Sequence, residues 1–397
     1  MKKFLMASAA MTLCAGTAFA DGHAKEVKLG VMLGFTGPIE SLTPMMAAGA
    51  ELAMAEATAS GKLLDGAKVT PVRADSTCVD SGAATAAAEK LIADGINGLM
   101  GADCSGVTGA VLANVAIPNG LVMVSPSASS PGLSDVEDNG LFFRTTPSDA
   151  RQGQVMAAVM KERGIESIAL TYTNNDYGKG LADSIKANFE AVGGEVTIVA
   201  AHEDGKGDYS AEVAALASAG GDVLVVAGYL DQGGLGIIQG ALDTGAFDTF
   251  GLPDGMIGDS LPENVGPDLD GSFGQIAGSQ NKGADVFYAA ATEAGFDGTS
   301  SYAAESYDAA ALLMLAMQAA GSVDPAEYAS KVMDVANAPG EEISAGELAK
   351  GLEILAAGGD INYQGATGVE LVGPGESAGS FREVEVQSGK IETVKYR

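Results

Sequence analysis

The chain has 397 residues, of which 47% are hydrophobic and 19% charged, a composition typical of a folded globular protein and not of a disordered one. Its formal net charge of −30 at pH 7 disfavours binding to nucleic acids and to anionic membrane surfaces. Because the length exceeds what a single hydrophobic core usually organises, we expect two lobes.

The N-terminal residues are typical of an export signal. Two lysines precede an apolar stretch over 4–18, and Ala18-Phe19-Ala20 fits the small-residue pattern of a cleavage site. We therefore predict a signal peptide over 1–20, cleavage after Ala20, and a periplasmic protein without direct membrane insertion. The alternative is an uncleaved anchor. The stretch is too short and too rich in small residues for a good membrane span, and no later run reaches about 18 apolar residues.

Strand-like and helix-like segments then alternate. The first series has expected strands over 27–34, 69–75, 98–101 and 121–124 and expected helices over 45–59, 82–93 and 107–116. After residue 147 a second series begins, with expected strands over 167–173, 196–200, 223–229, 250–252 and 273–278 and helices over 151–163, 181–192, 211–219 and 235–242. Repeated βα units imply parallel sheets with helices on both faces, so the pattern predicts an α/β fold of two doubly wound lobes.

The last third of the chain changes character. It is expected to be mostly helical at first, over 285–294, 302–320, 325–335 and 346–356. It then returns to β structure over 369–372, 381–386 and 391–396, with a Ser388-Gly389 turn that predicts a terminal hairpin.

Two polar segments lie where an expected strand gives way to a helix: Gly101 to Gly106 and Ser125 to Pro131. In an open α/β sheet, ligands bind at the carboxyl ends of the strands, where helix N-termini offer free N–H groups. Neither segment has a basic residue, so hydroxyls and backbone amides would hold an anion there. This favours reversible capture of a small carboxylate over catalysis.

Beyond the signal, the chain has two cysteines, Cys78 and Cys104. An even number in an exported protein favours a disulfide between them. The alternative is a nucleophilic Cys104, as in an exported amidase, but such a residue needs a base and the chain has only His23 and His202. No glycine-rich phosphate loop has the required spacing. We expect no enzyme activity, no catalytic residue, no metal site and no cofactor.

At these residues the chain resembles the periplasmic solute-binding proteins of branched-chain amino acid ABC transporters, the leucine/isoleucine/valine type with the type I periplasmic-binding fold. The resemblance covers the chain from about residue 27 to its end. Its landmarks, in chain order, are Gly34-Phe35-Thr36-Gly37-Pro38, the two cysteines, Cys104-Ser105, Ser125-Pro126-Ser127-Ala128-Ser129, Phe143-Arg144-Thr145, Asn175-Asp176-Tyr177-Gly178, Asp208-Tyr209-Ser210, Gly228-Tyr229 and Pro253-Asp254-Gly255.

The resemblance implies two lobes joined by three hinge crossovers, near Thr145, Gly278 and Gly359. The first lobe is then expected to comprise 26–145 plus 279–358, and the second 146–278 plus 359–397.

The resemblance also implies a set of ligand-binding residues, expected between the lobes. Ser105 and Ser129 match positions that hold the ligand carboxylate, and the carbonyl of Ser127 matches an acceptor for its ammonium group. The remaining matches are Ala128 in the same turn, Asp254 as the acidic partner of the ammonium, Tyr229 beside it, Tyr177 as an aromatic lid, and Leu42 beside the ligand side chain. Two positions depart from the family pattern: Asp254 replaces a longer glutamate, and Leu42 replaces an aromatic residue.

We therefore predict a protein that captures a small amino acid, branched-chain or aliphatic, and delivers it to an inner-membrane ABC permease, acting as a monomer. A different ligand in the same role would be an amide, a urea, or an aromatic or short-chain carboxylate. A purely anionic ligand would leave Asp254 a buried, unpaired charge. An exported amidase and a sensory ectodomain fit the chain less well.

Overall fold

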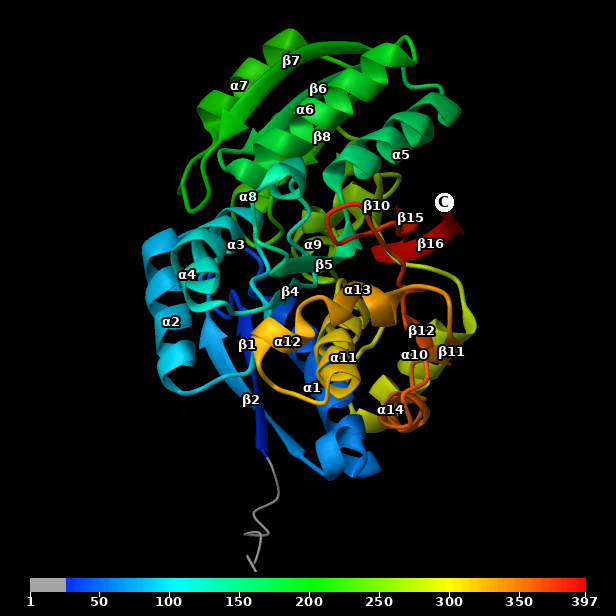
Figure 1. Cartoon of the computed structure of the whole chain (residues 1–397). Helices are drawn as coiled ribbons and strands as arrows, with labels where there is room; N and C mark the ends of the chain where they lie inside the picture. Colours follow the sequence, from blue (N-terminus) through cyan, green and yellow to red (C-terminus); the bar gives the residue numbers. More distant parts are fainter. Residues whose placement is uncertain (1–25) are drawn as a thin grey trace, which may run out of the picture.

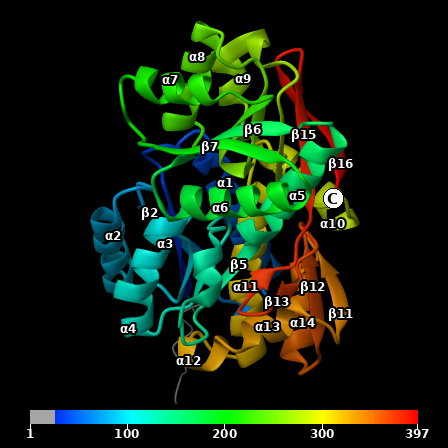
Figure 2. The ribbon, with the colours of Figure 1, turned by 90° about the horizontal axis from the view of Figure 1, so that it is seen from above.

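The computed structural model describes residues 26–397 (Figure 1). The predicted signal peptide and its cleavage site lie outside these residues. Two seven-stranded sheets organise the described chain, and a small third sheet accompanies the first. In both views the segments around residues 150–245, drawn in green, form one group, and the segments around residues 26–125, drawn in blue and cyan, form another (Figures 1 and 2).

The first sheet is parallel except at one edge. Its strands, in spatial order, are β13 (Leu371–Val372), β14 (Glu376–Ser377), β5 (Phe142–Pro147), β4 (Met123–Ser125), β3 (Gly98–Gly101), β1 (Glu26–Leu33) and β2 (Lys68–Asp75). Only β13 pairs antiparallel with its neighbour. The side chains of β3 and β4 are buried throughout, as expected for parallel strands covered on both faces.

The second sheet repeats this architecture. Its strands, in spatial order, are β16 (Lys390–Tyr396), β15 (Phe381–Gln387), β10 (Phe273–Ala277), β9 (Phe250–Leu252), β8 (Val223–Ala227), β6 (Ser167–Thr173) and β7 (Glu195–His202). The strands from β7 to β10 are parallel, and the terminal hairpin β15–β16 joins them antiparallel, as the sequence predicted. The third sheet, β11 (Glu341–Ser344) with β12 (Ile361–Gly365), was not expected from the sequence.

Helices flank both sheets. Their bounds are α1 (Thr43–Ser60), α2 (Ser81–Ala93), α3 (Ser105–Val111), α4 (Ile117–Asn119), α5 (Asp149–Glu162), α6 (Asp176–Ala191), α7 (Ser210–Ala219), α8 (Gly233–Thr244), α9 (Ser260–Val265), α10 (Lys282–Ala294), α11 (Ala303–Ala320), α12 (Pro325–Tyr328), α13 (Lys331–Ala336) and α14 (Leu348–Ala356). Polar caps begin several of them: Ser148 accepts from the second residue of α5, and Asn175 accepts from the third residue of α6. The helix expected over 107–116 divides into α3, a π-helical turn and α4.

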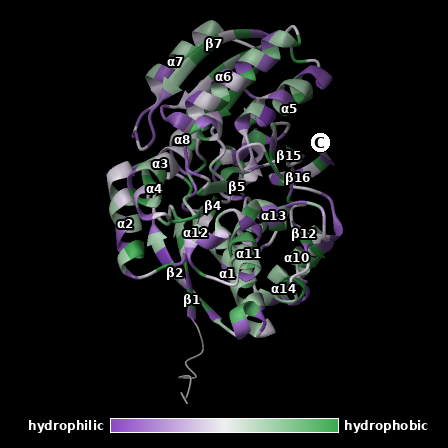
Figure 3. Cartoon of the chain, viewed as in Figure 1, coloured by the Kyte–Doolittle hydropathy of each residue, from purple (hydrophilic) through white to green (hydrophobic). Residues whose placement is uncertain are grey.

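The centre of the first lobe is α11, which is buried from Ala303 to Gln318. Figure 3 shows its mainly apolar character, typical of a helix surrounded by the protein interior. Its partner is α1. The two backbones approach so closely that a Cβ added at Gly49 would lie 2.1 Å from the carbonyl oxygen of Ala303, so this crossing requires glycine.

The order of the strands in the two large sheets shows that the chain crosses from one sheet to the other three times. It leaves the first sheet after β5, leaves the second after β10, and returns from β14 to β15. The stretch 371–377 therefore belongs to the first sheet, whereas the sequence assigned all of 359–397 to the second lobe. The pairing of β14 with β5 decides this placement, and two-residue strands give almost no hydrophobic periodicity from which to predict it.

Candidate functional site

A cavity of about 310 Å³ lies between the two lobes. All of its lining except Tyr302 comes from the loops that follow parallel strands of both large sheets, the place where open α/β sheets bind ligands. The lining residues are Ile39, Leu42, Asp103, Cys104, Ser105, Ser127, Tyr177, Tyr229, Gly255 and Tyr302. A pocket with a few convergent polar groups and apolar walls suits a small organic solute.

The first lobe supplies hydroxyls and a rigid carboxylate. Asp103 is buried but well bonded, since its carboxylate accepts from the Gly34 amide at 2.5 Å and from Ser76 Oγ at 2.7 Å. Burial raises the pKa of Asp103, and these hydrogen bonds oppose the shift. The Ser127 hydroxyl donates to the backbone carbonyl of Asp103 at 2.9 Å. The group of Ser127 that can accept from a ligand is therefore its own backbone carbonyl.

Arg144 holds the ligand loop 125–131 in place. Its side chain is buried, and its guanidinium donates to the carbonyls of Ala128 at 3.0 Å and Ser130 at 2.9 Å. It also forms a 2.5 Å ion pair with Glu376 on β14. A buried arginine with several acceptors can orient a loop because its donors form a rigid planar fork. Arg144 is therefore a positioning residue for the turn that carries the predicted ligand groups.

The second lobe covers the cavity with stacked tyrosines. The Tyr177 and Tyr229 rings lie 5.0 Å apart at an interplanar angle of 15°. The Tyr177 hydroxyl donates to Asp254 Oδ1 at 2.7 Å and accepts from the Gly255 amide at 3.1 Å. Burial raises the pKa of both tyrosines well above the ordinary value, so both are neutral donors.

Asp254 lies behind this aromatic layer and does not line the cavity. It begins a short 3-10 turn, is 1% exposed, and accepts from its neighbouring amide of Gly255 at 2.8 Å. Burial raises its pKa, while hydrogen bonding by Tyr177, Tyr302 and Gln152 opposes the shift. Its carboxylate thus sets the orientation of the tyrosine hydroxyls.

The structure brings most of the predicted residues together. Five line the cavity: Leu42, Ser105, Ser127, Tyr177 and Tyr229. The other three, Ala128, Ser129 and Asp254, are buried close to the lining but are not part of it.

Five further lining residues were not predicted as ligand residues: Ile39, Asp103, Cys104, Gly255 and Tyr302. Tyr302 precedes α11 in a left-handed conformation with φ 62°, which is uncommon for a tyrosine and invisible in a propensity pattern.

Direct contacts hold the two lobes together around the cavity. The Asp231 carboxylate of the second lobe accepts from the Ser41 amide of the first at 2.8 Å, and the Asp231 amide donates to the Pro38 carbonyl at 2.9 Å. On another side, Ser130 Oγ donates to the carbonyl of Asp176 at 3.0 Å. The structure therefore represents a closed arrangement of the lobes.

Cys78 and Cys104 form the expected disulfide, with their Cα atoms 5.1 Å apart. The bridge joins the loop after β2 to the start of α3, directly beside Ser105. Because the sulfur of Cys104 is bonded to that of Cys78, it is not a free nucleophile in this structure.

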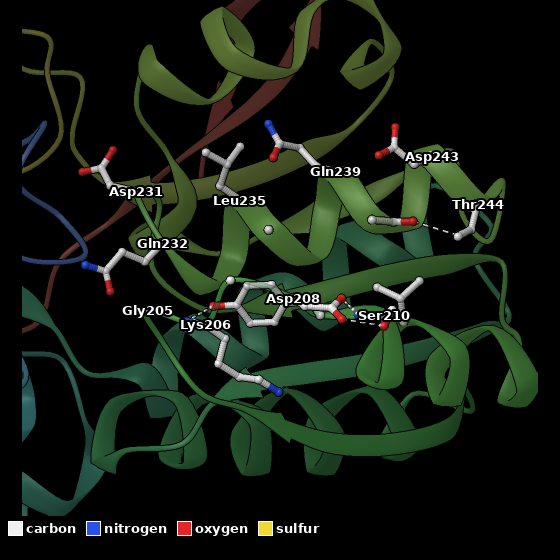
Figure 4. A pocket seen from close by; sticks show the side chains of 15 residues that line it. Gly205, Lys206, Asp208, Ser210, Asp231, Gln232, Leu235, Gln239, Asp243 and Thr244 are labelled. Carbon is white, nitrogen blue, oxygen red and sulfur yellow. Dashed lines mark hydrogen bonds between the residues drawn. The ribbon is translucent and has the colours of Figure 1, made fainter.

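A second, larger hollow, of about 1270 Å³ by the same measure, lies between α7 and α8 on the second lobe. Figure 4 shows its open, mixed lining, with Leu235 and Gln239 on one side and Asp208 and Ser210 on the other. It is lined by the second lobe alone and includes none of the predicted ligand residues, whereas the cavity between the lobes includes five of them.

Metal-binding clusters and membrane-spanning helices are both absent from the part of the chain that the structure describes. Among residues 26–397, no three His, Cys, Asp or Glu side chains gather as they would around a metal ion. No helix within the same residues has the length and apolarity needed to cross a membrane.

The fold and the cavity between the lobes define a two-lobed receptor for a small solute. A family model described as "Periplasmic binding protein" matches residues 26–344. The chain belongs to this family, as its resemblance predicted. A curated relative, the Leu/Ile/Val-binding protein homolog 1 of Brucella melitensis, is 30% identical over 339 residues, which cover 84% of this chain and 89% of the relative.

Solved structures show the same fold. The leucine binding protein LivK from Thermotoga maritima aligns with a TM-score of 0.78 at 22% identity, covering 93% of this chain and 98% of that one. A solute binding protein from R. palustris in complex with benzoate aligns with a TM-score of 0.73 at 19% identity, covering 94% of this chain and 96% of that one. The expected type I periplasmic-binding fold is confirmed.

Proposed function

We propose that this protein captures an aliphatic L-amino acid, such as leucine, isoleucine or valine, between its lobes in the periplasm and delivers it to an inner-membrane ABC permease. It acts as a monomer after removal of residues 1–20. Closure of the lobes over the ligand is the signal for delivery, because a ligand that contacts both lobes favours the closed state by its differential affinity.

The observation that carries this proposal is the polarity of the cavity. Hydroxyl and amide groups at Ser105 and in the ligand loop suit a carboxylate. The Ser127 carbonyl, with the carboxylate of Asp254 behind the tyrosine layer, suits an ammonium group. Ile39 and Leu42 provide an apolar wall for an aliphatic side chain. The names of the similar proteins, which include Leu/Ile/Val-binding and leucine binding proteins, support the same ligand class.

The alternative is an aromatic carboxylate, favoured by the three tyrosines of the lining and by the benzoate complex of a structural relative. The buried carboxylate of Asp254 argues against it. Benzoate has no cationic group, so it would leave Asp254 without a charge partner and add a second negative charge nearby. We also propose that the protein is not an enzyme, since the disulfide occupies the thiol that an amidase would need.

A thermal-shift series on the mature protein tests this function. L-Leucine, L-isoleucine and L-valine are compared with benzoate and with the corresponding amides. A ligand at about 100 times its Kd stabilises by about 2.7 kcal/mol, which raises the Tm of a chain of this length by about 3 °C. A shift with the amino acids alone is expected. A shift with benzoate alone, or turnover of an amide, would refute the proposal.

A further inference from the structure

The carboxylate of Asp149 is buried next to the ligand loop, and the donor that faces it there, the Ser129 hydroxyl, does not reach normal hydrogen-bond geometry. Asp149 is the first residue of α5, is 0% exposed, and neither of its oxygens is hydrogen-bonded within residues 26–397. It does not cap its helix, because Ser148 already does so. A buried ionised carboxylate in this condition is costly, so such a group is normally paired or protonated.

The surroundings of Asp149 belong to the ligand site. Its amide donates to the carbonyl of Ser129 at 2.9 Å, which joins α5 to the ligand loop. The Ser129 hydroxyl is also buried and unpaired within the described chain, as is Gln152 Oε1, one helical turn further along α5. These three groups therefore gather beside the ligand loop, behind the residues that line the cavity.

The charged and titratable groups near Asp149 come from several elements. They are Asp254 on its 3-10 turn, Arg144 on β5, Tyr177 on α6 and Tyr302 before α11. Arg144 is the cation of this group, but its guanidinium does not donate to Asp149. It donates instead to two backbone carbonyls of the ligand loop, to the Ser134 hydroxyl and to the Glu376 carboxylate. The positive charge of Arg144 is thus already paired with Glu376 and does not neutralise Asp149.

Asp149 and Asp254 behave as a pair. Burial, and then the charge of Asp254, raises the pKa of Asp149 well above its ordinary value, whereas the nearby Ser129 hydroxyl and Arg144 lower it. Burial also raises the pKa of Asp254, which has more hydrogen-bond donors and is therefore the ionised member. A single proton held by Asp149 would relieve the repulsion between the two buried carboxylates before a cation binds.

We propose that Asp149 is a second acidic specificity residue of the ligand site, and that a cationic nitrogen of the ligand displaces its proton. The inference rests on the proposed function and deepens it. The incoming ammonium group brings a positive charge to a cluster of acceptors, the Asp149 O–H bond breaks, and the proton leaves to buffer. The site therefore selects for a protonated amine and against ligands that have only a carboxylate.

Isothermal titration of the mature protein with L-isoleucine tests the proposal. It is performed at pH 7 in phosphate and in Tris, two buffers of very different ionisation enthalpy. A buffer-dependent binding enthalpy that corresponds to release of about 0.3 proton or more per ligand is expected. Equal enthalpies in the two buffers, with isoleucine bound, would overturn the role of Asp149 and leave the proposed function intact. No binding by any amino acid would overturn both.

A matched pair of variants assigns the proton. Asp149→Asn is expected to abolish the buffer dependence and to weaken isoleucine binding about tenfold at pH 8, with a smaller loss at pH 6. The control is Asp285→Asn, since Asp285 is likewise an acidic residue in the first turn of a helix, α10, but is exposed and away from the ligand loop. It should retain the wild-type proton release. Retention of proton release by Asp149→Asn would refute the assignment. Equal enthalpies in the wild-type titration would overturn the proposal without any variant, even where Asp149→Asn does not fold.

Discussion

Reduction of the Cys78–Cys104 disulfide should destabilise the protein by an amount that its loop length predicts. The bridge closes a loop with a sequence separation of 26. The chain-entropy estimate for such a loop is about 3.5 kcal/mol at 25 °C. A chain of this length has an unfolding entropy of roughly 0.8 kcal/mol/K near its Tm, so the expected decrease is about 4 °C.

Differential scanning calorimetry with and without a reductant measures this shift. The control is the Cys78→Ala/Cys104→Ala double variant, whose Tm should be lowered by a similar or larger amount and should not respond to reductant. Both sulfurs are buried, so the unfolded chain has to be reduced before the scan. A Tm change below about 1 °C on complete reduction would refute the loop-entropy reasoning.

Two further predictions concern lobe closure and pH. Asp231→Ala removes the acceptor for the Ser41 amide and should weaken ligand binding about threefold to tenfold, because it destabilises the closed state. The control, Asp243→Ala on the exposed face of α8, should leave the affinity unchanged. Equal affinities of the two variants in titration calorimetry would contradict the role of this contact. Burial raises the pKa of Glu305 to about 8, so the folded state holds a proton that the unfolded state has lost, and stability should fall as pH rises from the ordinary glutamate pKa to about 8. Glu305→Gln should flatten this decrease and exceed wild-type stability at pH 8 by about 1–3 kcal/mol in urea unfolding, and an unchanged pH slope would count against the buried-acid explanation.

Much of the fold was predictable because it rests on local patterns. Apolar runs such as the one in β8 are buried on both faces, and they identify parallel strands without any knowledge of their neighbours. The alternation of such runs with helices leaves few possible topologies. The small sheet β11–β12 was missed because its strands are short and one of them has a mixed burial pattern.

The site was predictable where its residues lie at strand ends. Ser105 and Ser127 follow β3 and β4, and Tyr229 follows β8, so their positions at the cavity follow from topology. Asp254 was predicted as a direct partner of the ligand, and the structure places it behind the tyrosine layer. Whether the ammonium reaches it directly or through the tyrosine hydroxyls stays a prediction for the binding experiments.

The sequence by itself determined the two series of βα units, the cysteine pair and the polar turns after buried strands, because each depends on neighbouring residues or on counting. The export signal that it predicts stays a prediction. Only the tertiary structure decided which distant groups meet. Arg144 and Glu376 are 232 residues apart in the chain, and the partners of Asp149 come from separate segments. Hydrophobic periodicity reports whether a side chain is buried. It does not report which other side chain is buried against it, because that depends on how the chain crosses between the lobes.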